Sequence, residues 1–567
     1  MIVTKNNFQS GQTLTADICI IGSGPAAISM ALSLDSLRRT IIIVAGGAWS
    51  ETVDNQDLNR GVVATPGSHE PLEENRRRQF GGTSAAWGGR CIPFDPIDFK
   101  KRSWVPDSGW PFPYETLEPY YRKAASLCQI GDSTFNAHAA FPDNPREIIA
   151  GLDSTDFVSN HLERWSPPIN FAKAYRTELD RSLAIQVLLD AHVLKINMVD
   201  NSDQVSSVAV AVDGFQISIE ATTFVLAAGG IENPRLLLAS HNKQFPTGMG
   251  NLHDNVGRYY MAHLSGIYAE INPANRDSLL ADFERDPEGV YCRRRWWIPE
   301  EAQKAHKLLN SIFFLYLSHS TEGHRDLLFS ARFVSKGLLS IASQKSVRNA
   351  VRKARLVFPD LKEHLINMGT KSFSQLPNLF RLGMKRLAKR RLPYLLPAMN
   401  SKYWGLYFQT EQIPNRESRV FLSTSKTDAF GVPRAEVSIA FLEADVESVV
   451  LAHNLFVENF RRKNLGEVLY SEAGLRAYIA ESMRSFNSGA HHIGTTRMSD
   501  DPRTGVVDRN AKVYGLSNLY IAGSSVFPTG GHANPTFTII AHALLLADHL
   551  KTKNSIRDFA DQSLVVK

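Results

Sequence analysis

Short apolar runs alternate with a helix-like segment at the amino-terminal end of the chain. Residues 17–21 (DICII) and 41–44 (IIIV) are apolar enough for buried strands, and GSGPAAISMALSL between them favours a helix. A strand, a helix and a second strand in this order predict a βαβ unit in a parallel sheet. This end of the chain therefore predicts an α/β fold.

The same alternation returns near the carboxyl-terminal end. Residues 518–523 (NLYIAG) predict a short strand, a turn rich in proline and glycine follows, and an apolar helix begins near Phe537. This order puts His532 and Asn534 in a polar loop between the end of a strand and the start of a helix. Ligands collect at such places in open α/β sheets, and the amides of a helix start favour anions or an electron-rich ring.

The middle of the chain carries strand-like runs of alternating polarity. WGLYFQTEQ (404–412), SRVFLS (418–423) and AEVSIAF (435–441) predict an antiparallel sheet that forms the floor of a substrate cavity. With 567 residues, of which 43% are hydrophobic, the chain is long enough for two structural domains around large cores.

A glycine motif follows the first predicted strand. Residues 22–27 (GSGPAA) form the pattern GxGxxA. The first glycine permits a tight turn, the second lets the backbone approach a pyrophosphate, and Ala27 lets the helix pack close to the strand. The alternative is a glycine-rich turn without a ligand. Because the motif stands between a strand and a helix, it favours a dinucleotide site.

A second glycine-rich segment, GGTSAAWGG (81–89), has four glycines in nine residues around Trp87. Backbone without side chains can lie flat against a planar ring system. A surface glycine turn is the alternative.

Four separated motifs in this order resemble the glucose-methanol-choline (GMC) family of FAD-dependent oxidoreductases. They are GSGPAA, RRRQFGGTSAAWGGR (76–90), AAGGIENPRLLL (227–238) and the block from HHIGTTRM (491–498) to ANPT (533–536). That last block most resembles the branch of pyranose oxidases and bacterial glycoside 3-oxidases. The resemblance implies a Rossmann-like FAD-binding domain with an inserted substrate domain of antiparallel sheet and helices.

The resemblance implies a discontinuous FAD-binding domain. We expect residues 14–100, 188–265 and 488–555 to form it, and residues 101–187 and 266–487 to form the substrate domain, including a basic helical insertion at 332–402.

The resemblance also assigns residues to the cofactor. They are Gly22, Ser23, Gly24, Pro25, Ala26, Ala27, Gly46, Gly82, Thr83, Ser84, Trp87, Gly88, Val193, Ala228, Gly523, Ser524, Asn534, Pro535 and Thr536. Ala86 stands where pyranose oxidases carry the histidine that bonds to the flavin, so we expect noncovalent FAD. Val44 stands where the family usually has the glutamate that holds the adenosine ribose, which leaves this task to backbone, water or a side chain such as Glu51.

Alcohol oxidation by a flavin needs a base for the hydroxyl proton and a hydrogen-bond donor for the developing alkoxide. The resemblance assigns the base to His491 and the hydrogen-bonding partner to Asn534. His492 is the alternative base, and a structural role for His491 is another possibility. Gln409, Glu411 and His532 are candidate substrate contacts, although Glu411 could equally be a surface charge on a strand.

The expected reaction is therefore FAD-dependent oxidation of a CH–OH group, with hydride passing to flavin N5. The expected substrate is a small-molecule alcohol or sugar, and a sugar or glycoside is favoured. Two alternatives stay open at this point, a GMC-like lyase or non-sugar alcohol oxidoreductase, and a catalytically idle membrane-associated flavoprotein. The sequence does not distinguish oxygen from another electron acceptor.

Cysteine usage and charge bear on location and partners. The four cysteines show no CxxC pair and no metal-ligand spacing, and no export signal or spanning apolar run is present, so a cytoplasmic protein is expected. Residues 332–402 hold sixteen Lys and Arg against two acidic residues, a net +14, whereas the rest of the chain carries −8. This segment predicts a solvated helical insertion, or one that contacts an anionic membrane surface or glycoconjugate. No recognition motif for nucleic acid accompanies the charge.

Overall fold

The computed structural model describes residues 2–3, 8–317, 402–484 and 490–565, with a few single positions between 330 and 393. Apart from those positions, the predicted basic insertion at 332–402 lies outside the described residues. Within the described ranges, every helix is too short or too polar to span a bilayer. All four cysteines are free and buried.

The first sheet has eight strands and is parallel at its centre. Its order is β1 (Ile2–Val3), β7 (Ile185–Leu188), β3 (Ile41–Val44), β2 (Thr13–Ile21), β10 (Phe215–Leu226), β9 (Val205–Val212) and β8 (Ala191–Met198), with β19 (Leu519–Ile521) beside the last three residues of β10. The pairs from β1 to β10 and the β10–β19 pair are parallel, whereas β9 runs antiparallel to both of its neighbours. The βαβ unit predicted from the amino-terminal pattern is present as β2, α1 (Pro25–Leu34) and β3.

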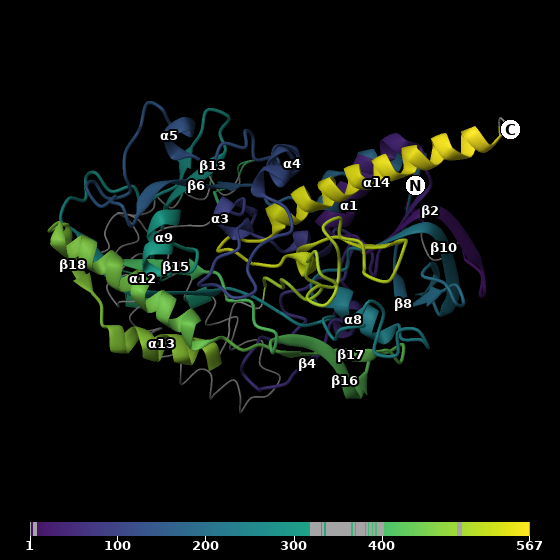
Figure 1. Ribbon diagram of the computed structural model, residues 1–567. Helices are drawn as coiled ribbons and strands as arrows, with labels where there is room; N and C mark the ends of the chain where they lie inside the picture. Colours follow the sequence, from purple (N-terminus) through teal and green to yellow (C-terminus); the bar gives the residue numbers. More distant parts are fainter. Residues whose placement is uncertain are drawn as a thin grey trace.

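Helix α1 lies against the first sheet at β2 and β3, and α14 (Thr536–Val565) lies against α1. α1 begins with Pro25 at its first turn, where the missing N–H costs nothing, and its small residues let it pack closely. α14 begins one residue before the predicted start and also lies against α4 (Tyr114–Cys128), as Figure 1 shows for the long yellow helix. The side chains of β3 are buried on both faces, which explains its unbroken apolar run.

The second sheet also has eight strands, and all its printed pairs are antiparallel. Its order is β18 (Gly466–Leu469), β11 (Leu264–Pro273), β15 (Trp404–Thr410), β14 (Ser311–Leu317), β13 (Tyr291–Trp297), β6 (Val158–Trp165) and β5 (Arg90–Cys91), with β12 (Glu284–Arg285) beside β13. α9 (Glu300–His306), α12 (Glu443–Arg462) and α13 (Glu472–Arg484) lie with this sheet, at the end of the molecule opposite to β2 and β10 (Figure 1).

A small third sheet corrects one expectation from the sequence. The runs at 418–423 and 435–441 do not join the sheet of β15. They form β16 (Arg419–Thr427) and β17 (Pro433–Ser438), which pair with each other and with β4 (Val62–Val63), beside α8 (Glu232–Ala239). Alternating polarity predicts a strand but not the sheet that the strand joins.

The strands also bear on the predicted domain division. β7 (Ile185–Leu188) lies almost wholly in the range expected for the substrate domain but belongs to the first sheet, whereas β5, before residue 101, belongs to the second. β1 joins the first sheet from residues 2–3, which lie outside both expected domains. The division itself stays a prediction.

A buried ion pair joins two segments that lie far apart in the chain. Both carboxylate oxygens of Glu411, just after β15, accept hydrogen bonds from the guanidinium of Arg102, and one of them also accepts from the backbone N–H of Asn310. The side chains of Arg102 and Glu411 are 2% and 0% exposed.

We therefore predict that Glu411→Gln lowers the free energy of unfolding by about 3–5 kcal/mol, because it leaves a buried guanidinium without its counter-charge. Urea unfolding followed by circular dichroism measures this change. The matched control is Glu417→Gln, whose carboxylate is 78% exposed. Equal midpoints for the two variants would contradict a stabilising role for the pair.

Candidate active site

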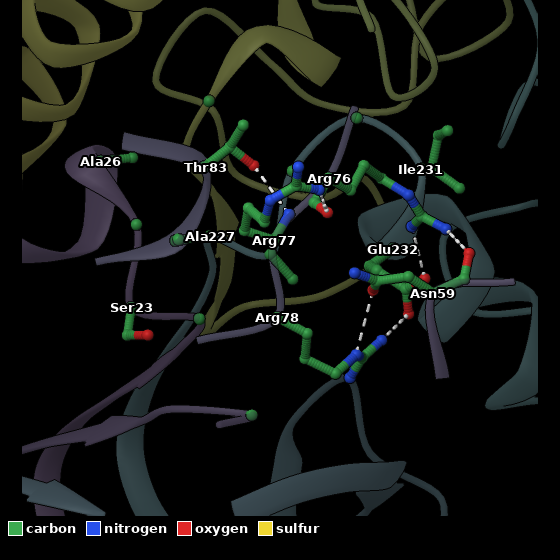
Figure 2. A pocket seen from close by; sticks show the side chains of 18 of the residues that line it. Ser23, Ala26, Asn59, Arg76, Arg77, Arg78, Thr83, Ala227, Ile231 and Glu232 are labelled. Carbon is green, nitrogen blue, oxygen red and sulfur yellow. Dashed lines mark hydrogen bonds and ion pairs between the residues drawn. The ribbon is translucent and has the colours of Figure 1, made fainter. Parts of the chain in front are cut away.

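One elongated cavity collects the sequence motifs. It runs past the carboxyl ends of β2, β3 and β10 and reaches the first residues of α1 and α14. Its walls come from GSGPA (22–26), the arginines 76–78, the loop at 82–87, the strand start at 191–194 and the segments at 227–232, 490–492 and 522–524. Figure 2 shows Ser23, Ala26, Thr83 and Ala227 around this space. Segments separated by more than 500 residues therefore line one cavity.

Most residues assigned to the cofactor line this cavity. Those that do are Gly22, Ser23, Gly24, Pro25, Ala26, Gly46, Gly82, Thr83, Ser84, Trp87, Val193, Ala228, Gly523, Ser524, Pro535 and Thr536. Ala27 is fully buried in the core, and Gly88 does not belong to the lining. Asn534 also lies outside the lining, and its side chain bonds to His491, which lines the cavity.

Two glycines explain why the motif suits a dinucleotide. A Cβ on Gly22 would lie 2.3 Å from the carbonyl oxygen of Ala227, so only glycine allows β2 and β10 to approach this closely. A Cβ on Gly24 would meet nothing within 4 Å, so open space lies beside this residue. Gly24 caps α1 without a side-chain hydrogen bond, and the first turn of α1 carries no acidic residue. The free amides there suit a pyrophosphate, and the residues present fit FAD.

Several residues on the walls were missed by the sequence analysis. Asn59, His192, Glu232, Asp428 and Phe430 all line the cavity. His192 directly precedes Val193, which the sequence analysis assigned to the cofactor, and this position was the one signal in the sequence that could have identified it. The last two come from the turn between β16 and β17, and nothing in the sequence places that turn here. Glu51 does not line the cavity, and its carboxylate accepts from the backbone N–H of Arg78 instead.

His491, which lines the cavity, contacts Asn534, 43 positions further along the chain. The Nδ2 atom of Asn534 lies 3.0 Å from Nε2 of His491. The backbone on the carboxyl side of His491 is held by Ile493, which pairs with Met261, and Asn534 directly precedes Pro535 and α14. Gln409 of β15 donates from Nε2 to Oδ1 of Asn534 at 3.3 Å. The second sheet thus orients the amide that faces His491.

A chain of hydrogen bonds determines which nitrogen of His491 carries the proton. His263 places Nε2 2.9 Å from the carbonyl oxygen of Gly531 and Nδ1 2.8 Å from Nδ1 of His491. A carbonyl only accepts, so neutral His263 donates from Nε2 and accepts at Nδ1. His491 must then donate from Nδ1. Its Nε2 keeps a lone pair and points to Asn534.

Burial keeps both imidazoles neutral at pH 7. It lowers the pKa of His263 to about 3, with the charge of His532 and Arg90 acting in the same direction. The pKa of His491 lies well below its ordinary value of 6.5, first because of burial and then because of His263, Arg90 and His492. His491 can therefore accept a proton at neutral pH.

The remaining predicted residues are placed as follows. Gln409 touches Asn534, and its Oε1 accepts from Arg90 at 3.1 Å and from the hydroxyl of Tyr407 at 3.2 Å. Glu411 is enclosed in the ion pair with Arg102, away from the cavity lining. His532 is fully buried, with Nε2 2.8 Å from a carboxylate oxygen of Asp95.

His492, the alternative base, also lines the cavity. Its ring lies 6.4 Å from that of His69 and 6.0 Å from that of Tyr260, measured between centroids, and its carbonyl oxygen accepts from Ser524. The side chain of Asn534 donates its hydrogen bond to His491 and not to His492.

Comparisons with known proteins agree with this geometry. Residues 414–543 match the family model described as GMC oxidoreductase. The fructose dehydrogenase large subunit of Gluconobacter japonicus is 22% identical over 95% of this chain and 98% of its own length. Paromamine 6′-oxidase of Streptomyces fradiae is 23% identical, over 93% of this chain and 90% of its own.

A solved structure shows the same fold over nearly the whole chain. The crystal structure of pyridoxine 4-oxidase from Mesorbium loti superposes with a TM-score of 0.52 at 17% identity, covering 94% of this chain and 98% of that one. The family match in the carboxyl-terminal part, the full-length relatives and the shared fold point in one direction: residues 414–543 match the GMC oxidoreductase model, and the whole chain is similar to oxidases and dehydrogenases and has the fold of pyridoxine 4-oxidase.

Proposed function

We propose that this protein is an FAD-dependent enzyme that oxidises a CH–OH group of a sugar or glycoside. The observation that carries the proposal is the contact of Asn534 with His491, which lines the dinucleotide cavity. A base and a hydrogen-bond donor side by side are the two groups that alcohol oxidation requires.

The roles of the two side chains follow from their protonation. FAD, when bound, supplies the hydride acceptor. Nε2 of His491 takes the hydroxyl proton, because Nδ1 already carries one that it donates to His263. The amide of Asn534 donates to the oxygen on which negative charge develops, and an amide does not compete for the proton. Gln409 keeps the oxygen of that amide turned away from His491.

Polar groups next to this pair support a substrate with several hydroxyls. Gln409, Tyr407 and Arg90 form a hydrogen-bonded group on the second sheet beside Asn534. Relatives named as a fructose dehydrogenase and a paromamine 6′-oxidase support the same class. A non-sugar alcohol is the second candidate, since the name of the similar structure is pyridoxine 4-oxidase. These names include both oxidases and a dehydrogenase.

FAD is held without a covalent bond in this proposal. Ala86, which follows the turn Gly82–Ala85, offers only a methyl group where pyranose oxidases carry the attaching histidine. We predict that precipitation of the purified protein with acid releases all flavin absorbance into the supernatant. Flavin that stays in a washed, denatured pellet would show a covalent link.

Loss of the base should slow the reduction of the flavin without loss of the flavin itself. We predict that His491→Ala lowers the rate of anaerobic reduction by a sugar substrate by roughly 10²–10⁴-fold, the usual effect of general-base removal. Stopped-flow absorbance measures this rate, and the flavin content of the variant checks that the site is intact. The matched control is His492→Ala. If His492→Ala is the slow variant and His491→Ala is normal, the roles are reversed.

The pH dependence of the same rate should reflect the depressed pKa of His491. The neutral form is the active one, so the rate stays constant as pH falls from 8 through 6.5 and declines only below that value. His263→Leu removes the acceptor for the Nδ1 proton and should lower the plateau at least about tenfold, because the wrong tautomer then competes. His263→Gln keeps an acceptor and should retain more of the rate. Equal plateaus for wild type and His263→Leu would contradict the tautomer argument.

A further inference from the structure

The far end of the cavity lacks the acidic residue that dinucleotide folds place after their second strand. Such an acid follows the glycine motif by about 20 residues and hydrogen-bonds the ribose hydroxyls. Here the position is Val44, the last residue of β3, and its side chain offers no polar atom. A ribose bound at this end must find its partners elsewhere on the walls.

Among the neutral side chains of those walls, two have a buried polar atom without a hydrogen-bond partner; Nη2 of Arg78 also lacks a hydrogen bond but lies in an ion pair with Glu232 at 3.0 Å. The two atoms are Nδ1 of His192, on β8, and Nδ2 of Asn59, the residue after α2 (Val53–Leu58). Both residues line the cavity. Buried polar atoms are rarely left unpaired in proteins, so each such atom on a cavity wall indicates a missing ligand contact.

Both atoms lie on the wall next to the end of β3. A Cβ on Gly46, two residues after Val44, would lie 3.7 Å from Nδ1 of His192 and 3.3 Å from Nη1 of Arg78. Arg78 in turn donates from Nε to Oδ1 of Asn59 at 3.1 Å, as Figure 2 shows. Arg78 therefore lies between His192 and Asn59, and Gly46 leaves the space in front of them open.

The charged groups around these atoms are already paired. Arg76, Arg78 and Arg235 all form ion pairs with Glu232, and Arg235 also pairs with Asp428. Figure 2 shows Arg76 and Arg78 turned toward Glu232. The unpartnered atoms at this end belong to an amide and an imidazole, which suit hydroxyl groups better than a phosphate.

The imidazole of His192 is neutral. Burial lowers its pKa to about 4, and the charge of Arg78 acts in the same direction. A neutral imidazole has one accepting and one donating nitrogen. It can accept from a hydroxyl as a carboxylate would, without adding a charge beside the ion-paired arginines. The ring of Phe430, 5.1 Å away between centroids, holds the imidazole in place.

We propose that His192 and Asn59 bind the ribose hydroxyls of the adenosine half of FAD, in place of the missing acid at Val44. His192 meets one hydroxyl through Nδ1, and the amide of Asn59 donates to a hydroxyl oxygen. The inference rests on FAD as the cofactor of the proposed function.

The test compares FAD with an FAD analogue whose adenosine carries 2′,3′-dideoxyribose, each titrated into flavin-free protein and followed by flavin fluorescence. The wild-type protein should bind the analogue about tenfold or more weakly than FAD, since one lost hydrogen bond of ordinary strength has this effect. This arm needs no mutation, so it does not depend on a variant that folds.

His192→Leu should bind FAD more weakly than the wild type does and should prefer FAD over the analogue by a smaller factor, because only the hydroxyl contact of Asn59 remains. Asn59→Ser tests the second contact in the same way. The matched control is His241→Leu, an exposed histidine that does not line the cavity and should leave both affinities unchanged.

Two outcomes overturn the inference while leaving FAD binding intact. One is equal binding of FAD and the dideoxy analogue by the wild type. The other is a His192→Leu variant that still prefers FAD by the wild-type factor. Tighter binding of a nucleotide with a 2′-phosphate would also contradict it. A protein that binds none of these flavins would contradict the proposed function itself.

Discussion

The approach of Gly22 to the backbone of Ala227 is the constraint on which the rest of this structure depends. A Cβ at Gly22 would lie 2.3 Å from the carbonyl oxygen of Ala227, so the ends of β2 and β10 lie side by side only because glycine is there. This contact sets the width of the cavity where the glycine motif, the segment at 227–232 and the start of α14 meet. Strand β19 pairs with the same end of β10, and His491, which contacts Asn534, lines the cavity.

Residues on or next to the second sheet orient the two side chains that we propose as catalytic. Gln409 of β15 turns the amide of Asn534, and His263, next to β11, fixes the protonated nitrogen of His491. Neither residue needs to touch a substrate to act in this way. Because both imidazoles are buried and neutral, the proton on Nδ1 of His491 follows from a backbone carbonyl two hydrogen bonds away. In our proposal, the geometry of the backbone thus determines which nitrogen of His491 acts as the base.

The sequence was most informative where glycine and buried strands stand together. The βαβ unit, the start of α14 and many of the residues that line the cavity were predictable, because GxGxxA and unbroken apolar runs each have a local physical cause. The sequence did not predict the contacts of His263 with His491 and of Gln409 with Asn534, since they join residues more than 100 positions apart. Glu411 is a similar case. A glutamate at this position was compatible with a substrate contact, and only the fold showed that it forms a buried ion pair with Arg102. The periodicity of the sequence also did not predict which sheet β16 and β17 join. For the same reason it did not predict that Phe430, in the turn between them, packs against His192.

The central claim is that His491 and Asn534 serve the oxidation of a hydroxyl-bearing substrate beside a bound flavin. The most direct measurement is an anaerobic screen in which the purified yellow protein is mixed with sugars, glycosides and simple alcohols, and its absorbance near the flavin maximum is followed. Our account predicts that at least one sugar or glycoside bleaches the flavin and that simple alcohols act more weakly. Bleaching by dithionite but by none of the hydroxyl compounds would contradict it.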